Sequence, residues 1–346
     1  IYGTGTLCAA LIMIWAGGLT DRFRVRQIGP LTLVLLSVAC LLMAVTPAAW
    51  VLLPAVMLLR LTGQSMCSHI ATVAMARWFV ATRGRALAIA STGFSVGEAI
   101  LPLSFVLLLS IVSWRWLWVL AALLSLLAIP MLLSLLRQER TPQSVATSNQ
   151  STGLFDRHWS RGEVLRHPLF WMLTPLLLGP PAFVTALFFQ QVHLSEVKGW
   201  SHVQFVALFP VYTLSVITAL FLSGIAIVRW GTARLIPVFQ IPLMLGFILM
   251  GTTGSIAGAT LAMLLIGLCS GSSNNVTAAF WAEYFGTRNL GAIRAVAMAL
   301  MVLGSAIGPA LSGALIDLGV SFDRQMPLAA IWFALSSALA GWGVWR

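Results

Sequence analysis

The chain of 346 residues is 59% hydrophobic and 8% charged, with a formal net charge of +11. A water-soluble globule carries about a quarter charged residues, so this composition excludes a soluble domain and indicates a protein embedded in a lipid bilayer. The basic excess does not indicate nucleic-acid binding, because most of it lies on connections between apolar segments.

Long apolar runs follow one another along the chain. Most approach or exceed the roughly 20 residues that a helix needs to cross a bilayer, and they are too long for the strands of a membrane barrel. We therefore predict an all-α membrane protein with eleven spans, at about 1–18, 30–47, 50–75, 86–111, 115–136, 168–190, 203–228, 235–251, 255–281, 291–316 and 326–345.

One polar stretch divides these runs into two groups. Residues 138–153 are rich in Gln, Ser and Thr, a composition typical of a flexible linker. We predict an N-terminal helical bundle over 1–136, a linker over 137–167 and a C-terminal bundle over 168–346. Most basic residues lie on alternate connections, at 22–26, 77–85, 137–166, 229–234 and 288–294. The positive-inside rule then places the linker and the C-terminus in the cytoplasm, as in a multi-pass protein of the bacterial inner membrane.

The two halves repeat one pattern in the same orientation. Gly17, Pro30 and Gly84 recur 207 residues later as Gly224, Pro237 and Gly291. A parallel repeat is typical of transporters whose substrate site lies between the halves near the bilayer midplane. The run at 168–190 has its repeat-mate before residue 1, so we expect a twelve-helix parent whose first helix precedes this chain.

The segment that joins the first two runs carries the most specific motif. Gly17-Gly18-Leu19-Thr20-Asp21-Arg22 resembles the loop signature of the major facilitator superfamily, although Arg24 replaces its later glycine. Smaller features at 78–86 and 284–288 resemble the monocarboxylate-porter and oxalate–formate-antiporter branch. The resemblance implies two pseudo-symmetric six-helix bundles that transport a solute by alternating access.

By the same resemblance, Gly17, Asp21, Arg22 and Arg77 form a cytoplasmic latch. The Asp21 carboxylate can pair with Arg77 and face the positive end of the helix that begins near Gly291. Gly17 would let the two helices approach closely. The alternative is a basic loop that only sets the topology.

A polar stripe runs along the third run. Arg60, Gln64, Ser68 and Thr72 recur every four residues, which places them on one side of a helix. A membrane-buried arginine costs about 2.5–3.5 kcal/mol on insertion scales and indicates function. Glu98 on the next helix lies at similar depth, so the two form either a structural pair or a coupling site in which Glu98 takes a proton and Arg60 holds an anion. His69 could also couple to protons, or simply be packed.

Polar residues in the second half are candidates to line a shared cavity. Gly271, Asn274 and Asn275 match the depth of the stripe through the repeat, but they could instead be hydrogen-bonding contacts between helices. Gln190 and Gln191 close another span as a cap or a gate.

We predict an ion-gradient-driven transporter of a small anionic organic solute, acting as a monomer. Its partners would be that solute, a coupling ion such as the proton, and the bilayer. No enzyme motif, cofactor, metal or nucleic-acid site is expected. The alternatives are a proton-coupled multidrug exporter and a non-transporting, receptor-like or inactive membrane protein.

Overall fold

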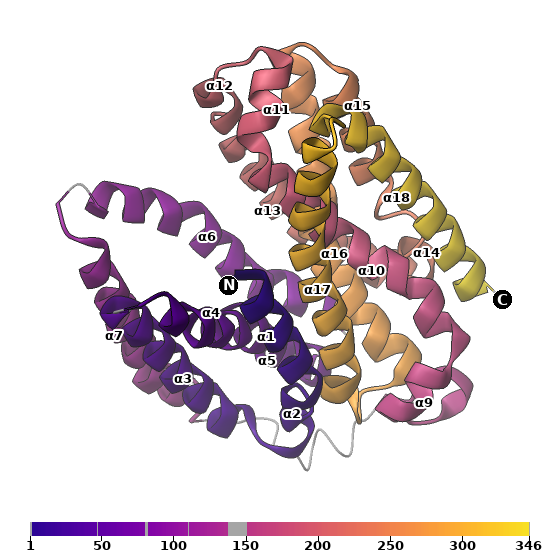
Figure 1. Ribbon diagram of the computed structural model, residues 1–346. Coiled ribbons are helices and arrows are strands. Elements are labelled where there is room, and N and C mark those ends of the chain that lie inside the picture. The colour runs from indigo at the N-terminus through magenta and orange to yellow at the C-terminus, as the bar shows by residue number, and fades with distance from the viewer. Residues whose placement is uncertain (1, 47, 80–81, 110, 138–150, 346) are drawn as a thin grey trace. The chain divides into compact units, whose positions relative to one another are not determined.

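The computed structural model describes residues 2–46, 48–79, 82–109, 111–137 and 151–345. Within these ranges every regular element is a helix (Figure 1), which confirms the predicted all-α class. Part of the predicted linker, 138–150, lies outside the described residues. Among the described residues, eight helices are long and apolar enough to cross a membrane.

The first half of the chain follows the predicted runs closely. Its helices are α1 (Tyr2–Ala16), α2 (Leu19–Arg22), α3 (Val25–Val45), η1 (Ala49–Val51), α4 (Leu52–Leu59), η2 (Arg60–Met66), α5 (Cys67–Trp78), α6 (Arg83–Leu109) and α7 (Trp114–Leu135). The predicted run at 50–75 corresponds to α4, η2 and α5, which follow one another without a break. η2 is a π-helical segment in which the amide of Cys67 bonds the carbonyl of Thr62, and such wide turns are frequent at functional sites.

The second half contains longer helices with short connections. They are η3 (Leu154–Asp156), α9 (Arg161–Arg166), α10 (Pro168–Phe189), α11 (Gln191–Lys198), α12 (His202–Val206), α13 (Phe209–Trp230), α14 (Thr232–Leu235), α15 (Ile241–Thr252), α16 (Ile256–Phe285), α17 (Leu290–Asp317) and α18 (Phe322–Trp345). The run predicted at 235–251 is regular helix only in α15. Turns occupy 236–240, where Pro237 cannot donate a backbone hydrogen bond.

The helices form two compact units. The first contains residues 1–80, 96–161 and 281–302, and the second contains 81–95, 162–280 and 303–346. In the first unit α3 packs along α7, and α1 packs against α4 and η2. In the second unit α18 packs against both α10 and α15. The predicted division into bundles over 1–136 and 168–346 stays a prediction.

Glycines allow the closest helix contacts of the second unit. A Cβ at Gly304 would lie 2.7 Å from the Leu178 carbonyl oxygen, and one at Gly308 would overlap the backbone of Ala182, so α17 and α10 meet backbone to backbone. Gly84 and Gly224 make a similar contact between α6 and α13, where a Cβ at Gly224 would lie 2.9 Å from the Gly84 carbonyl oxygen. Small residues at such contacts are typical of membrane helix packing.

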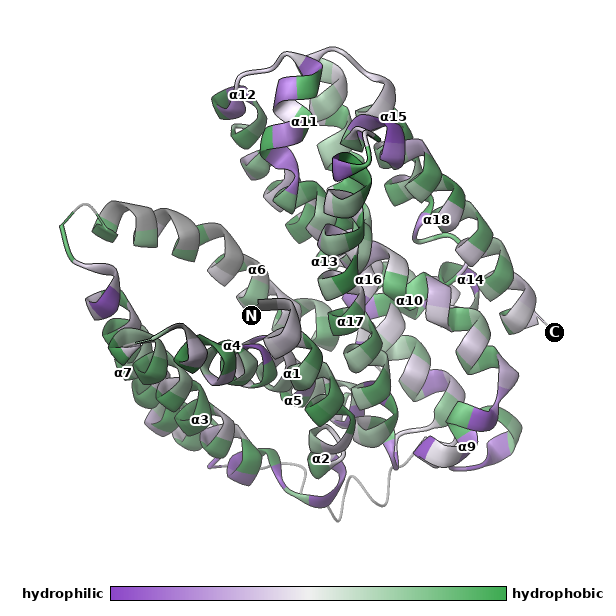
Figure 2. Cartoon of the chain, viewed as in Figure 1, coloured by the Kyte–Doolittle hydropathy of each residue, from purple (hydrophilic) through white to green (hydrophobic). Residues whose placement is uncertain are grey.

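The long helices are hydrophobic along most of their length, as helices in a bilayer must be. Figure 2 shows hydrophobic residues along most of each long helix, whereas hydrophilic residues gather around α9 and α11 and near helix ends. Many large apolar side chains are exposed in this chain, for example Leu127 (67%) and Leu335 (66%). Exposed apolar surface of this extent fits a helix that faces lipid.

Candidate functional site

The candidate site begins at a break in the helix that leads to Asp21. α1 ends at Ala16 and two glycines follow, which destabilise a continuous helix. The amide of Gly18 bonds the Trp15 carbonyl at 3.1 Å, three residues back, so the Ile14 carbonyl loses its usual partner. The short helix α2 then carries Asp21 at its end.

The Asp21 carboxylate binds the start of α17. Oδ1 accepts a hydrogen bond from the amide of Gly291 at 2.8 Å, and Oδ2 accepts one from the amide of Ala292 at 2.6 Å. These first-turn amides have no partner within their own helix, and the helix dipole makes them attractive to an anion. The side chain is only 12% exposed, so the bonds form largely away from water.

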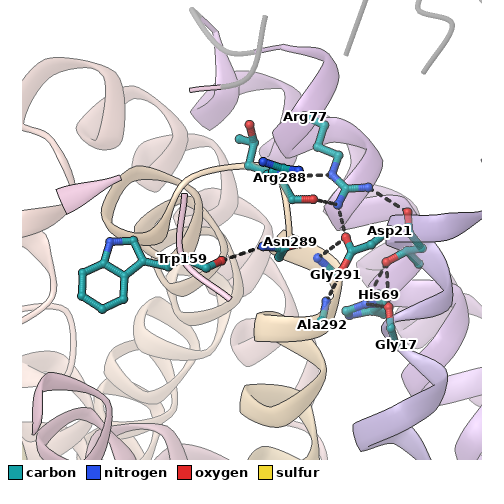
Figure 3. Close-up of polar contacts among 11 residues, drawn as sticks. Gly17, Asp21, His69, Arg77, Trp159, Arg288, Asn289, Gly291 and Ala292 are labelled. Atoms are coloured by element: carbon teal, nitrogen blue, oxygen red, sulfur yellow. Dashed lines mark hydrogen bonds and ion pairs between the residues drawn. The ribbon is translucent and has the colours of Figure 1, made fainter. Parts of the chain in front are cut away.

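Arg77, from the end of α5, completes this arrangement. Its guanidinium forms an ion pair with Asp21 and donates to the Thr20 carbonyl at 2.7 Å. It also donates to the carbonyls of Thr287 at 3.1 Å and Arg288 at 3.3 Å, in the loop before α17. We call Asp21, Arg77, Gly291 and Ala292 the Asp21 cluster, which joins α2, α5 and α17 within the first unit (Figure 3).

Two glycines make this close approach possible. A Cβ at Gly17 would overlap the side chain of Ala295 and lie 3.1 Å from His69 Nε2. A Cβ at Gly291 would overlap the Thr20 hydroxyl and lie 2.7 Å from Asp21 Oδ1. The predicted latch residues Gly17, Asp21 and Arg77 therefore meet in one place. The side chain of Arg22, the fourth predicted latch residue, is exposed on the surface of the protein.

A segment that the sequence indicated only as linker braces the Asp21 cluster. Ser151 and Thr287 exchange two hydrogen bonds of 3.1 Å, and Asn289 donates to the Trp159 carbonyl at 2.8 Å. Arg161 donates to the Ile14 carbonyl at 2.7 Å, which is the carbonyl freed by the break in α1. The Trp159 ring is buried and meets Phe285 edge to face. We call residues 151–161 the brace.

The imidazole of His69 lies beside the Asp21 cluster. It is fully buried, and its Nε2 is 3.2 Å from the Gly17 carbonyl oxygen and 3.5 Å from the Thr20 hydroxyl. Figure 3 shows the imidazole next to Gly17, on the side of Asp21 away from Arg77. The structure thus brings His69 together with the predicted latch residues.

The stripe starts inside the π-helical segment. Arg60 and Gln64 are hydrogen-bonded to each other and half-buried in η2. Ser68 is also half-buried, and the buried Thr72 donates its hydroxyl hydrogen to the carbonyls of Ser68 at 2.7 Å and His69 at 3.2 Å. Glu98 lies in α6, but its side chain is outside the described residues, so its pairing with Arg60 stays a prediction.

The polar residues of the second half have firm hydrogen-bond roles. Asn275 is buried; its amide donates to the Leu220 carbonyl at 3.1 Å and the Ser223 hydroxyl at 3.2 Å, and its oxygen accepts from the Ser91 hydroxyl at 3.1 Å. Asn275 therefore links α16 to α13 and α6 in the second unit.

The other predicted cavity residues divide between packing and helix ends. A Cβ at Gly271 would overlap the Val216 carbonyl, so Gly271 also serves the α16–α13 contact. Asn274 is half-buried. Gln190 ends α10 and donates to the Ser312 hydroxyl at 3.4 Å, and Gln191 begins α11. Among the described residues, no three His, Cys, Asp or Glu side chains gather as a metal site.

The comparisons with known proteins agree with this architecture. The family model of the Major Facilitator Superfamily matches residues 1–309. Among curated protein sequences none matches the chain.

Solved structures of low sequence identity share the fold. The human organic anion transporter MFSD10 (TETRAN) is 17% identical, with a TM-score of 0.75 over 98% of this chain and 82% of its own. The transporter FucP in its outward conformation is 12% identical, with a TM-score of 0.70 over 99% of this chain and 89% of its own. A structure of the E. coli fucose:proton symporter FucP gives 14% identity, a TM-score of 0.70 and coverage of 99% and 91%. The chain therefore belongs to the major facilitator superfamily of membrane transporters.

Proposed function

We propose that the protein moves a small anionic organic solute across the membrane by alternating access, with the proton as coupling ion. The main support for an anionic substrate is Arg60. This cation is half-buried within a π-helical segment and hydrogen-bonded to Gln64. A cation held inside a membrane helix is costly, and it can attract a carboxylate that passes through. The human structural neighbour, whose name is organic anion transporter, supports the same class.

In this proposal the Asp21 cluster is a latch on the cytoplasmic side. It holds α2 and α5 against the start of α17 through one ion pair and two amide hydrogen bonds. The linker and the C-terminus lie in the cytoplasm, the halves over 1–136 and 168–346 move as bundles, and the protein acts as a monomer. Gln64 and Asn274 line the path of the solute, and Glu98 accepts the proton.

Uptake into proteoliposomes with an imposed pH gradient tests this function. Radiolabelled mono- and dicarboxylates are supplied to vesicles that contain the full-length protein or its Arg60→Gln variant. We expect the variant to lose anion uptake by about 10- to 100-fold, since a hydrogen bond to a charged group contributes about 1.5–3 kcal/mol. Arg234→Gln, which removes an exposed arginine, is the matched control and should transport normally.

Other results would lead to other functions. Unchanged anion uptake in Arg60→Gln contradicts the proposed substrate class. Gradient-driven export of amphiphilic drugs from the same vesicles would identify an exporter. If no gradient-dependent flux of any solute occurs, the protein is not a transporter.

A further inference from the structure

Four polar atoms in the first unit are buried without a hydrogen-bond partner among the described residues: one is His158 Nδ1 in the brace, and the other three lie on helices. These three are Ser65 Oγ, His69 Nδ1 and Arg294 Nη1. Ser65 and His69 are fully buried, and Arg294 is 3% exposed. Buried polar atoms are almost always satisfied, so each of these needs an explanation.

The three side chains border one helix contact. Ser65 and His69 lie one turn apart on the continuous helix of η2 and α5, and Arg294 is near the start of α17. Their chain neighbours Met66 and Ala295 belong to one buried apolar cluster. A Cβ on Gly17 would meet both the Ala295 side chain and His69 Nε2, so the chain neighbour of Arg294 lies beside His69.

The charge of Arg294 has no counter-charge at this contact. The carboxylate of Asp21 is already bound by Arg77 and by the amides of Gly291 and Ala292. No ion pair to Arg294 occurs within the part of the chain that the structure describes. A guanidinium stays protonated in proteins, and a buried cation without a partner is strongly unfavourable. The site therefore favours a ligand with one negative charge.

The hydrogen-bond directions at His69 show which further group the ligand must carry. Thr20 donates its hydroxyl hydrogen to the Gly17 carbonyl at 2.7 Å. His69 Nε2 faces that carbonyl and the Thr20 oxygen, which are both acceptors, so Nε2 carries the hydrogen. In a neutral imidazole the other nitrogen, Nδ1, is then an acceptor. The ligand must accept from Arg294 and also donate to His69.

We propose that Ser65, His69 and Arg294 bind a small monoanion that keeps one hydroxyl hydrogen, of which hydrogen carbonate is the simplest example. Its anionic oxygens accept from Arg294, and its hydroxyl donates to His69 Nδ1. A halide supplies the charge without the donor, whereas water supplies the donor without the charge. The bound anion connects α17 to the helix of η2 and α5, so it stabilises the joined state of the Asp21 cluster.

Thermal unfolding of the purified full-length protein tests this site, with tryptophan fluorescence as the signal. The probes are sodium hydrogen carbonate, chloride and acetate at one pH and equal ionic strength. A ligand that binds only the folded state raises Tm as its concentration rises. We expect hydrogen carbonate to raise Tm in this way, and chloride and acetate to have much smaller effects.

Variants test separately the charge of Arg294 and the hydrogen-bond acceptor of His69. Arg294→Gln should lose the rise in Tm with hydrogen carbonate. Arg288→Gln, which removes an exposed arginine in the loop before α17, should keep it. His69→Leu should still respond to anions but no longer prefer hydrogen carbonate to chloride. Equal Tm in all three salts for the unmodified protein overturns the proposal, and that comparison needs no variant to fold. A hydrogen carbonate shift that persists in Arg294→Gln overturns it as well.

Discussion

Replacing Asp21 by asparagine removes the charge of the Asp21 cluster while it keeps the shape of the side chain. The amide oxygen can still accept from one α17 amide, but its NH2 group then faces the other donor. Arg77 loses its counter-charge in a place where it is only 17% exposed. Removing one partner of a buried ion pair costs about 3–5 kcal/mol. Because both side chains keep some exposure, we take about 3 kcal/mol, which shifts the equilibrium between the joined and separated states about 100-fold.

Hydrogen exchange at the start of α17 measures this shift directly. The amides of Gly291 and Ala292 donate to Asp21, so they exchange only when the cluster opens. In Asp21→Asn, peptides that contain these two amides should exchange about 100-fold faster than in the unmodified protein. Peptides from α15 and α18, in the second unit, should exchange as before.

The control is Glu196→Gln, which removes an exposed carboxylate on α11. It should leave exchange at Gly291 and Ala292 unchanged. If Asp21→Asn also leaves that exchange within about a factor of two, the Asp21 carboxylate does not hold α17 and the argument from the ion pair is wrong.

Three further predictions concern packing in the two units. Gly291→Ala places a Cβ on the Thr20 hydroxyl, so the same amides should lose their protection from exchange, and protection equal to that of the unmodified protein would contradict the close approach. Asn275→Leu removes three buried hydrogen bonds, to Leu220, Ser223 and Ser91, and should lower the free energy of unfolding by about 1–3 kcal/mol, measured as a lower Tm; an unchanged Tm would show that these bonds contribute nothing. Trp159→Ala removes a buried ring of the brace and should speed exchange in the loop at 285–289, whereas Trp171→Ala, at a ring that is 58% exposed, should not.

The contacts of Asp21 are the part of the site that the sequence could predict. A short motif places an acid at a helix end, and the dipole of the next helix and a nearby arginine attract it, so residue type and chain position are enough. The glycines of the repeat also predicted where the helices come closest, at Gly17 and Gly291.

Other residues could not be placed because their roles depend on helix rotation. Asn275 and Asn274 are neighbours in the chain, yet only Asn275 faces the Leu220 carbonyl, and repeat depth does not distinguish them. Arg294 looked like one more basic loop residue, although it lies inside α17 and is buried. The brace was missed because its polar sequence is typical of a linker, whereas contacts such as that of Asn289 with Trp159 depend on the folded chain.

The repeat relates the Gly17–Gly291 pair to the Gly224–Gly84 pair, but the two contacts are built differently. At Gly84 and Gly224 the backbones of α6 and α13 meet, and neither glycine contributes a side chain. A contact of this kind depends on the close fit of two backbones. The contact at Asp21 adds an ion pair with Arg77 and two hydrogen bonds from the amides of α17. The two repeat-related contacts should therefore respond differently to added salt, because the contact at Asp21 contains an ion pair that salt screens.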